Sequence, residues 1–172
     1  MHTAARSGTH HTVGGSAGAG FNRRNDGLGA HAGAVAFLNR DWGPFAQPET
    51  KAAGEQITAL QKQGSLFLHL DFHSTFKDVF YTQPDEVPTS SPGFTARWLE
   101  EIQKRVPEYT VNRSASPTPM PTTSAYWAHH TLGIPVITYE IGDNTDRSLL
   151  KRVAANAAQE MMMLLLEMKD SK

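Results

Sequence analysis

The sequence predicts an α/β protein, in which helices and buried strands alternate along the chain and pack as layers around one sheet. Apolar runs of strand length lie at residues 65–72 and 134–141. Residues 92–105 space their apolar side chains as one face of a helix does. The chain has 172 residues, which is enough for one domain with a single hydrophobic core.

The expected elements begin and end at residues that typically mark such boundaries. Pro48 marks a helix start, and Asp146 is placed to cap a long C-terminal helix. Gly64 and Gly133 mark helix ends. Residues 114–123 contain three prolines, so we expect a loop there that serves as a binding element. The expected helices are residues 48–63, 92–105, 124–132 and 147–168, and the expected strands are residues 65–72, 79–82 and 134–141.

Residues 1–36 differ sharply in composition from the rest of the chain. They hold eight of the 14 glycines and four of the eight histidines, with almost no Leu, Ile or Val. They also lack helical and strand periodicity, so we expect an irregular segment that builds no core. The alternative is that residues 1–36 are non-native sequence from a wrong start site or a shifted reading frame. In either case the folded domain is expected at residues 37–172.

Charge and composition argue against several classes of partner and site. The 16 Lys and Arg residues nearly balance the 17 Asp and Glu residues, which disfavours a nucleic acid or an anionic membrane as partner. Because the chain has no cysteine, a bound metal would need nitrogen and oxygen ligands. The longest apolar run, residues 161–166, is far shorter than the roughly 20 residues of a membrane span. No apolar stretch typical of a signal peptide follows Met1.

One buried strand carries an unusual series of polar residues. Strand alternation over residues 68–75 places His69, Asp71 and His73 on the same face. His69 and Asp71 are also compatible with a structural role, as hydrogen-bonded core residues. His73 lies at the strand end, where α/β enzymes place functional groups, and is therefore a candidate site residue.

Two further segments contain candidate functional residues. Glu140 lies close to the end of the second apolar strand, and a carboxylate held there suits a general base, although a salt-bridged or edge-exposed glutamate is the alternative. Asn39 and Arg40 precede Trp42 and a Gly-Pro turn. Because the planar fork of arginine matches a carboxylate, Arg40 is a candidate carboxylate ligand; the alternative is a surface arginine stacked on Trp42.

These three segments, in this order, resemble the zinc carboxypeptidases over about residues 37–168. The resemblance implies a three-layer α/β fold with a mixed, mostly parallel sheet and helices on both faces. It also implies that Asn39 and Arg40 grip the terminal carboxylate of the substrate. By the same resemblance His73 is a zinc ligand and Glu140 is the general base that takes a proton from zinc-activated water.

The sequence departs from this family at several points. The His-x-x-Glu motif that supplies two zinc ligands is absent, so the zinc site is expected to be incomplete. Arg24, or its neighbour Arg23, lies where relatives carry an oxyanion-stabilising arginine, but without the matching context. Tyr126 corresponds to a family tyrosine, although Trp127 follows it where relatives often have an acidic residue, and Tyr126 is alternatively a core aromatic.

The resemblance therefore implies the C-terminal part of a metallocarboxypeptidase catalytic domain, incomplete on its N-terminal side. Its expected function is zinc-dependent hydrolysis of a C-terminal peptide bond. Because the zinc site is incomplete, an inactive form of such an enzyme is also compatible with the sequence. Two alternatives stay open: a related zinc-dependent N-acyl-amino-acid hydrolase, and a non-catalytic remnant or binding module.

The expected partner is a peptide or small amide with a free carboxylate. Relatives are often exported, but localisation and oligomeric state are left open. An exposed sheet edge and apolar surface are expected to make the chain marginally stable or prone to aggregate.

Overall fold

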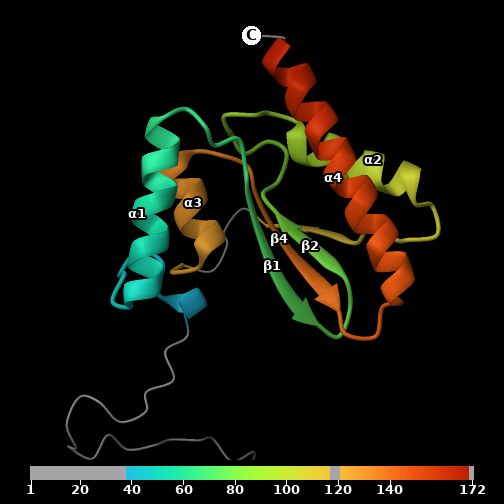
Figure 1. Cartoon of the computed structure of the whole chain (residues 1–172), viewed down its shortest axis with the longest axis horizontal. Helices are drawn as coiled ribbons and strands as arrows, with labels where there is room; N and C mark the ends of the chain where they lie inside the picture. The colour runs from blue at the N-terminus through green and yellow to red at the C-terminus, as the bar shows by residue number, and fades with distance from the viewer. Residues whose placement is uncertain (1–37, 117–120, 171–172) are drawn as a thin grey trace, which may run out of the picture. The chain divides into compact units, whose positions relative to one another are not determined.

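The computed structural model describes residues 38–116 and 121–170. The predictions for residues 1–36, Arg24 included, lie outside the described residues. The elements alternate as the sequence predicts (Figure 1). The helices are η1 (Leu38–Arg40, a 3-10 turn), α1 (Pro48–Lys62), α2 (Phe94–Arg105), α3 (Ser124–Leu132) and α4 (Arg147–Asp170). The strands are β1 (His69–Thr75), β2 (Val79–Thr82), β3 (Arg113–Ala115) and β4 (Val136–Gly142).

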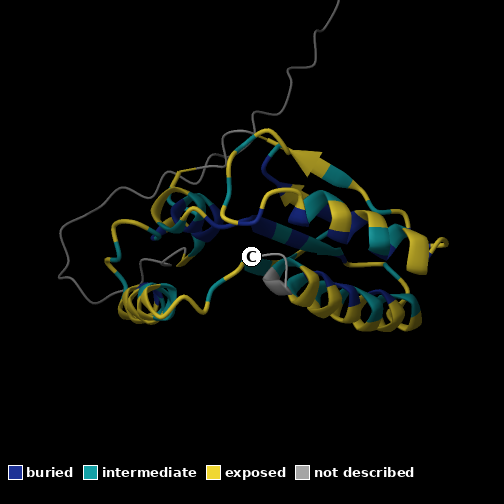
Figure 2. Ribbon diagram, turned by 90° about the horizontal axis from the view of Figure 1, so that it is seen from above, coloured by how far each residue is buried: buried dark blue, intermediate teal, exposed yellow. Residues whose placement is uncertain are grey.

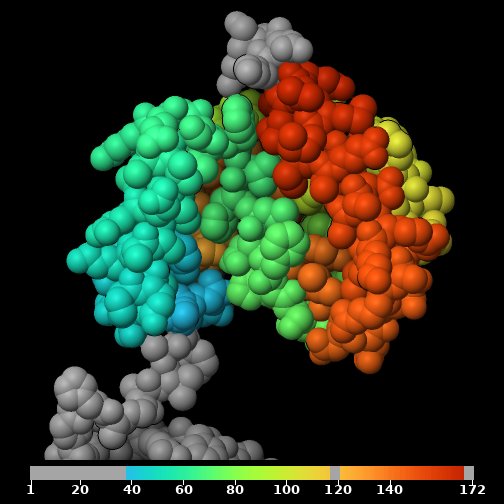
Figure 3. All heavy atoms as spheres, in the orientation of Figure 1, coloured from blue at the N-terminus to red at the C-terminus, as the bar shows by residue number. Residues whose placement is uncertain are grey.

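The four strands form one mixed sheet in the order β1-β4-β2-β3. The pairs β1–β4 and β2–β3 are parallel, and β2–β4 is antiparallel. The α/β class and the mixed sheet are therefore confirmed. Within the described residues β1 is an edge strand, and Phe72 and the following Phe76 are 61% and 75% exposed. Figure 3 shows this part of the chain in green on the surface between α1 and α4. The expected marginal stability stays a prediction.

Helices cover both faces of the sheet, as expected (Figures 1 and 2). On one face, α2 and α4 pack over Phe80 and Tyr139, whose rings stack at 4.2 Å between centroids. On the other face, Trp127 of α3 packs with Val136 of β4 and with residues of α1 and the loop before it. Side chains of β4 alternate between these two layers, because successive strand residues point to opposite faces.

Several expected boundaries are wrong: α2 begins at Phe94 rather than residue 92, β4 begins at Val136 rather than residue 134, and β1 ends at Thr75 rather than residue 72. β1 begins at His69 rather than at residue 65, because its partner strand β4 begins at Val136. The backbone N–H of His69 donates to Pro135 at 2.9 Å, and Pro135 has no N–H with which to extend the pairing. The expected loop at residues 114–123 also overlaps β3, a three-residue strand that pairs with β2.

None of the helices in residues 38–116 and 121–170 is both long enough and apolar enough to cross a membrane.

Candidate functional site

The pairing of β1 with β4 brings two of the predicted site residues together. In the parallel register His73 is the direct partner of Glu140. Both side chains lie on the face opposite the α2–α4 layer, because Phe72 and Tyr139, their neighbours in each strand, contact each other on that layer's side. Two residues that are far apart in sequence therefore lie side by side in the sheet.

The turn that carries Asn39 and Arg40 is fastened to the start of α1 by Asp41. The Asp41 carboxylate accepts hydrogen bonds from the backbone N–H of Ala46 at 3.0 Å and of Gln47 at 2.8 Å, and also from the Thr50 hydroxyl. The Thr50 hydroxyl and then the Gln47 N–H hold the pKa of Asp41 below its ordinary value. Asp41 therefore ties the end of η1 to the first turn of α1.

Asn39, Asp71, His73 and Ser124 form a polar network, which we call the Asp71 network. The Nδ2 atom of Asn39 lies 3.3 Å from Nε2 of His73, and the same Nε2 lies 3.0 Å from Oδ2 of Asp71. The Ser124 hydroxyl donates to Asp71 Oδ2, and the Ser124 backbone N–H donates to Asn39 Oδ1 at 3.4 Å. The network joins η1, β1 and the first residue of α3.

A cleft of about 480 Å³ opens beside this network, and we call it the central cleft. Its lining includes all four of the main predicted site residues: Asn39, Arg40, His73 and Glu140. Arg40 is exposed, and its Nη1 donates to the Asn39 carbonyl at 2.7 Å. In the part of the chain that the structure describes, Oε2 of Glu140 is buried and has no hydrogen-bond partner.

The cleft also contains hydroxyl groups that sequence reasoning did not identify. Tyr81 of β2 and Thr138 of β4 line it, and so does Ser114 of β3, which lies in the expected binding loop. Ser116 and Thr123, from the expected binding loop, line it as well. Strand alternation could have identified Thr138, which lies two residues before Glu140. The sequence carries no comparable signal for Ser124, whose place depends on how α3 packs against β1.

Two other predicted residues lie away from the cleft lining. Tyr126 is half-buried on α3 and stacks on His130, with 3.9 Å between ring centroids. His69 faces Trp42 edge-on, and its Nε2 is buried without a partner among the described residues. Burial lowers the pKa of His69, and the nearby Asp71 carboxylate only partly opposes this.

The described residues do not fit a zinc site. A catalytic zinc typically has three protein ligands, and no group of three His, Asp or Glu side chains within residues 38–116 and 121–170 is placed to hold a metal. His73 and Asp71 are the two donors at the expected position, and Asp71 Oδ2 already accepts from Ser124. The described residues alone therefore do not support zinc chemistry.

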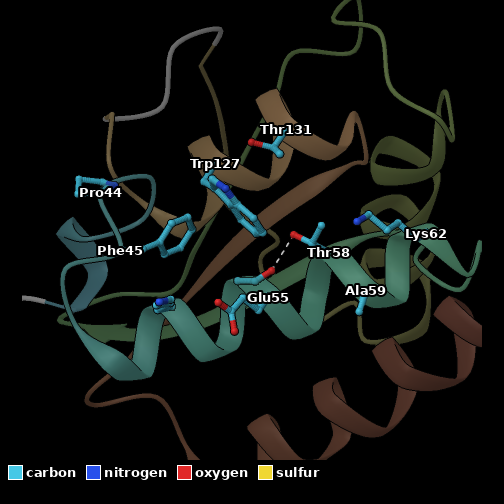
Figure 4. Close-up of a pocket in the computed structure, with 10 residues that line it drawn as sticks. Pro44, Phe45, Glu55, Thr58, Ala59, Lys62, Trp127 and Thr131 are labelled. Carbon is cyan, nitrogen blue, oxygen red and sulfur yellow. Dashed lines mark hydrogen bonds between the residues drawn. The ribbon is translucent and has the colours of Figure 1, made fainter.

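A second pocket of about 640 Å³ lies between α1 and α3 (Figure 4). Phe45 and Trp127 form its aromatic wall, and the Thr58 hydroxyl on the α1 side donates to the Gly54 carbonyl at 2.7 Å. None of the predicted site residues that the structure describes lines it. The central cleft is thus the candidate site, although it is the smaller of the two.

Comparison with known proteins bears on the fold. No family model and no curated protein sequence matches the chain. Among solved structures, a metallo-carboxypeptidase from Burkholderia cenocepacia aligns with 17% identity and a TM-score of 0.52, over 76% of this chain and 39% of that chain. A protein from Burkholderia mallei assigned as a carboxypeptidase aligns with 15% identity and a TM-score of 0.49, over 77% of this chain and 38% of its own. The fold is shared. The chain spans about two fifths of the length of these solved proteins.

Proposed function

We propose that this chain carries the carboxylate-binding part of a metallocarboxypeptidase-like hydrolase. One observation supports this above all: the central cleft gathers Asn39, Arg40, His73 and Glu140, which come from three separate elements. The shared fold with a metallo-carboxypeptidase structure is consistent with the proposal. The ligand class is a peptide, or a small N-acyl amino acid, that ends in a free carboxylate.

Arg40 is the group that would recognise this carboxylate. Its guanidinium is exposed at the cleft, and one Nη1 hydrogen bond to the Asn39 carbonyl leaves other N–H donors for a ligand. A carboxylate can accept two parallel hydrogen bonds from such a fork, which adds both strength and orientation. A ligand with a terminal amide in place of the carboxylate lacks the charge and one acceptor oxygen.

Glu140 is the group that would exchange a proton with a reacting water or leaving amine. Its unpartnered Oε2 is buried at the cleft, so this oxygen has lone pairs that no described residue uses. Such a carboxylate suits a general base when a water lies within hydrogen-bond reach. The described residues do not provide a zinc site. We therefore propose hydrolysis only for a protein in which residues outside the described ones supply the zinc ligands.

The test compares two ligands, an N-acetylated dipeptide with a free carboxylate and the same dipeptide as its C-terminal amide. Titration of the full chain, followed by NMR, should show the acid binding at least about tenfold more tightly, because charge-assisted hydrogen bonds are the stronger ones. Arg40→Ala should remove this preference. Arg97→Ala is the matched control, since Arg97 is an exposed arginine that pairs with Glu167 on the α2–α4 side of the sheet. Equal binding of acid and amide by the unmodified chain would contradict the proposal.

Zinc titration separates a hydrolase from a binding module. Tight binding of one zinc per chain, lost in His73→Ala, would mean that residues outside the described ones complete a metal site. Release of the C-terminal residue would then be assayed, with Glu140→Gln as the inactive control. Absence of zinc binding, together with retained preference for the acid, would favour carboxylate binding without catalysis by this chain.

A further inference from the structure

Ser124 uses both of its donors on residues of the Asp71 network. It is the first residue of α3 and only 3% exposed. Its backbone N–H donates to Asn39 Oδ1, and its hydroxyl donates to Asp71 Oδ2. The helix cap itself is made by Thr123, whose Oγ1 accepts from the N–H of Tyr126 at 3.2 Å. The Ser124 side chain is therefore not needed as a cap, and its contacts are directed to the central cleft.

The contact with Asn39 fixes which end of that amide lies beside His73, which also lines the cleft. A backbone N–H can only donate, so it holds the carbonyl oxygen of Asn39 and leaves Nδ2 on the His73 side. If the amide turned over, its oxygen would lie beside His73, and its partial negative charge would disfavour a carboxylate bound in the cleft. The Asn39 backbone carbonyl also accepts from Arg40, so the position of Asn39 influences that of the guanidinium.

The contact with Asp71 has an electrostatic effect on the same ligand. Asp71 lines the central cleft, where a free negative charge would oppose a carboxylate. The Ser124 hydroxyl donates to Asp71 Oδ2, and His73 Nε2 lies 3.0 Å from the same oxygen, so this oxygen is directed toward protein groups. Without the hydroxyl, one donor is lost and the Asp71 carboxylate is freer to turn toward the cleft.

We propose that Ser124 is a positioning residue for carboxylate recognition, acting through Asn39 and Asp71 on the ligand site that includes Arg40. This inference rests on the proposed function of the central cleft. Ser124 itself does not line that cleft, so its effect on a ligand passes through these two neighbours.

The test uses Ser124→Ala in the full chain, with the same acid and amide dipeptides as probes. This substitution removes the hydroxyl bond to Asp71 and keeps the backbone N–H bond to Asn39, so it tests the contribution of the side chain. The expected result is a loss of about tenfold in affinity for the acid, with little change for the amide. Ser148→Ala is the matched control, because the Ser148 hydroxyl also donates to an aspartate, Asp146 Oδ1 at 2.5 Å, beside the first turn of α4. The control should keep the acid-to-amide affinity ratio of the unmodified chain. If Ser124→Ala does not fold, Ser124→Cys keeps the size with a weaker donor and should give a smaller loss in the same direction.

The outcomes are distinguishable. A reduced acid-to-amide ratio in Ser124→Ala, with the ratio kept in Ser148→Ala, supports the positioning role. An unchanged ratio, or equal losses for both ligands, overturns it and leaves the proposed function standing. If the unmodified chain shows no preference and Arg40→Ala changes nothing, the proposed function fails, and this inference fails with it.

Discussion

Replacement of Trp127 by alanine should destabilise the layer that supports the candidate site. Trp127 is 8% exposed, and its ring centroid lies 5.3 Å from that of Trp42 and 5.6 Å from that of Phe45. A buried aromatic residue replaced by alanine typically loses about 3–5 kcal/mol, and the two ring pairs account for roughly 1–3 kcal/mol of this. Because Trp127 also borders the second pocket, we expect the lower end, about 3 kcal/mol, or roughly 10 °C in Tm.

Thermal unfolding followed by circular dichroism, together with urea titration, measures this loss. Tyr126→Ala is the control, since Tyr126 is the preceding residue on α3 and lies half-buried against His130 outside both core clusters. Its replacement should change the free energy of unfolding by less than about 1 kcal/mol. If both variants lose the same free energy of unfolding, or if Trp127→Ala loses less than about 1 kcal/mol, the aromatic rings do not hold α3 against the loop after η1.

Three further predictions concern residues in or next to strands β2 and β4. Gly142→Ala should lose about 1–3 kcal/mol in urea titration, since its Cβ would lie 2.5 Å from Thr145 Oγ1 and 2.7 Å from Asp78 Oδ2; an unchanged midpoint would contradict this. Burial raises the pKa of Asp78, but hydrogen bonds from the Thr145 and Tyr139 hydroxyls outweigh it and hold the pKa below its ordinary value. Ionised Asp78 therefore stabilises the folded state at pH values above its ordinary pKa, and this stabilisation is lost as the pH falls through the pKa of Asp78 in the folded state. As a result, Tm should fall more steeply below about pH 4 in the unmodified chain than in Asp78→Asn. Glu140→Gln should raise Tm slightly, because it removes the negative charge of a carboxylate that has one buried and unpartnered oxygen; a lower Tm would mean that the charge is compensated.

Elements with local signals could be predicted closely from the sequence. Helix α3 matches its expected bounds, because Thr123 accepts at its start and Gly133 adopts a left-handed φ of 66° at its end. Strand β2 also matches its expected bounds, and Asp146 caps α4 by accepting from the N–H of Leu149 at 2.8 Å. The predicted start of β1 is wrong because the actual start is determined by β4, a partner strand that lies far away in the sequence.

In the candidate site, too, local features could be predicted from the sequence and long-range contacts could not. Strand alternation places Asp71 and His73 on one face, and the cleft lining is consistent with this. The meeting of His73 with Glu140 depends on sheet register, which no local pattern specifies. The role of Ser124 depends on tertiary packing and carries no sequence signal. The assignments of Arg24, Asn39, Arg40, His73, Glu140 and Tyr126 to a catalytic or binding role stay predictions.

The parallel pairing of β1 with β4 has a consequence for how the protein folds. Parallel strands cannot be joined by a tight hairpin turn, and β2, α2, β3 and α3 all lie between these two in the chain. Pairings of such high sequence separation form slowly, because the intervening loop must be closed before its contacts stabilise anything. Helix formation should therefore precede cleft formation in refolding, so that far-ultraviolet circular dichroism recovers before carboxylate binding does. The ability to bind a ligand would then be acquired in the last and most global step of folding.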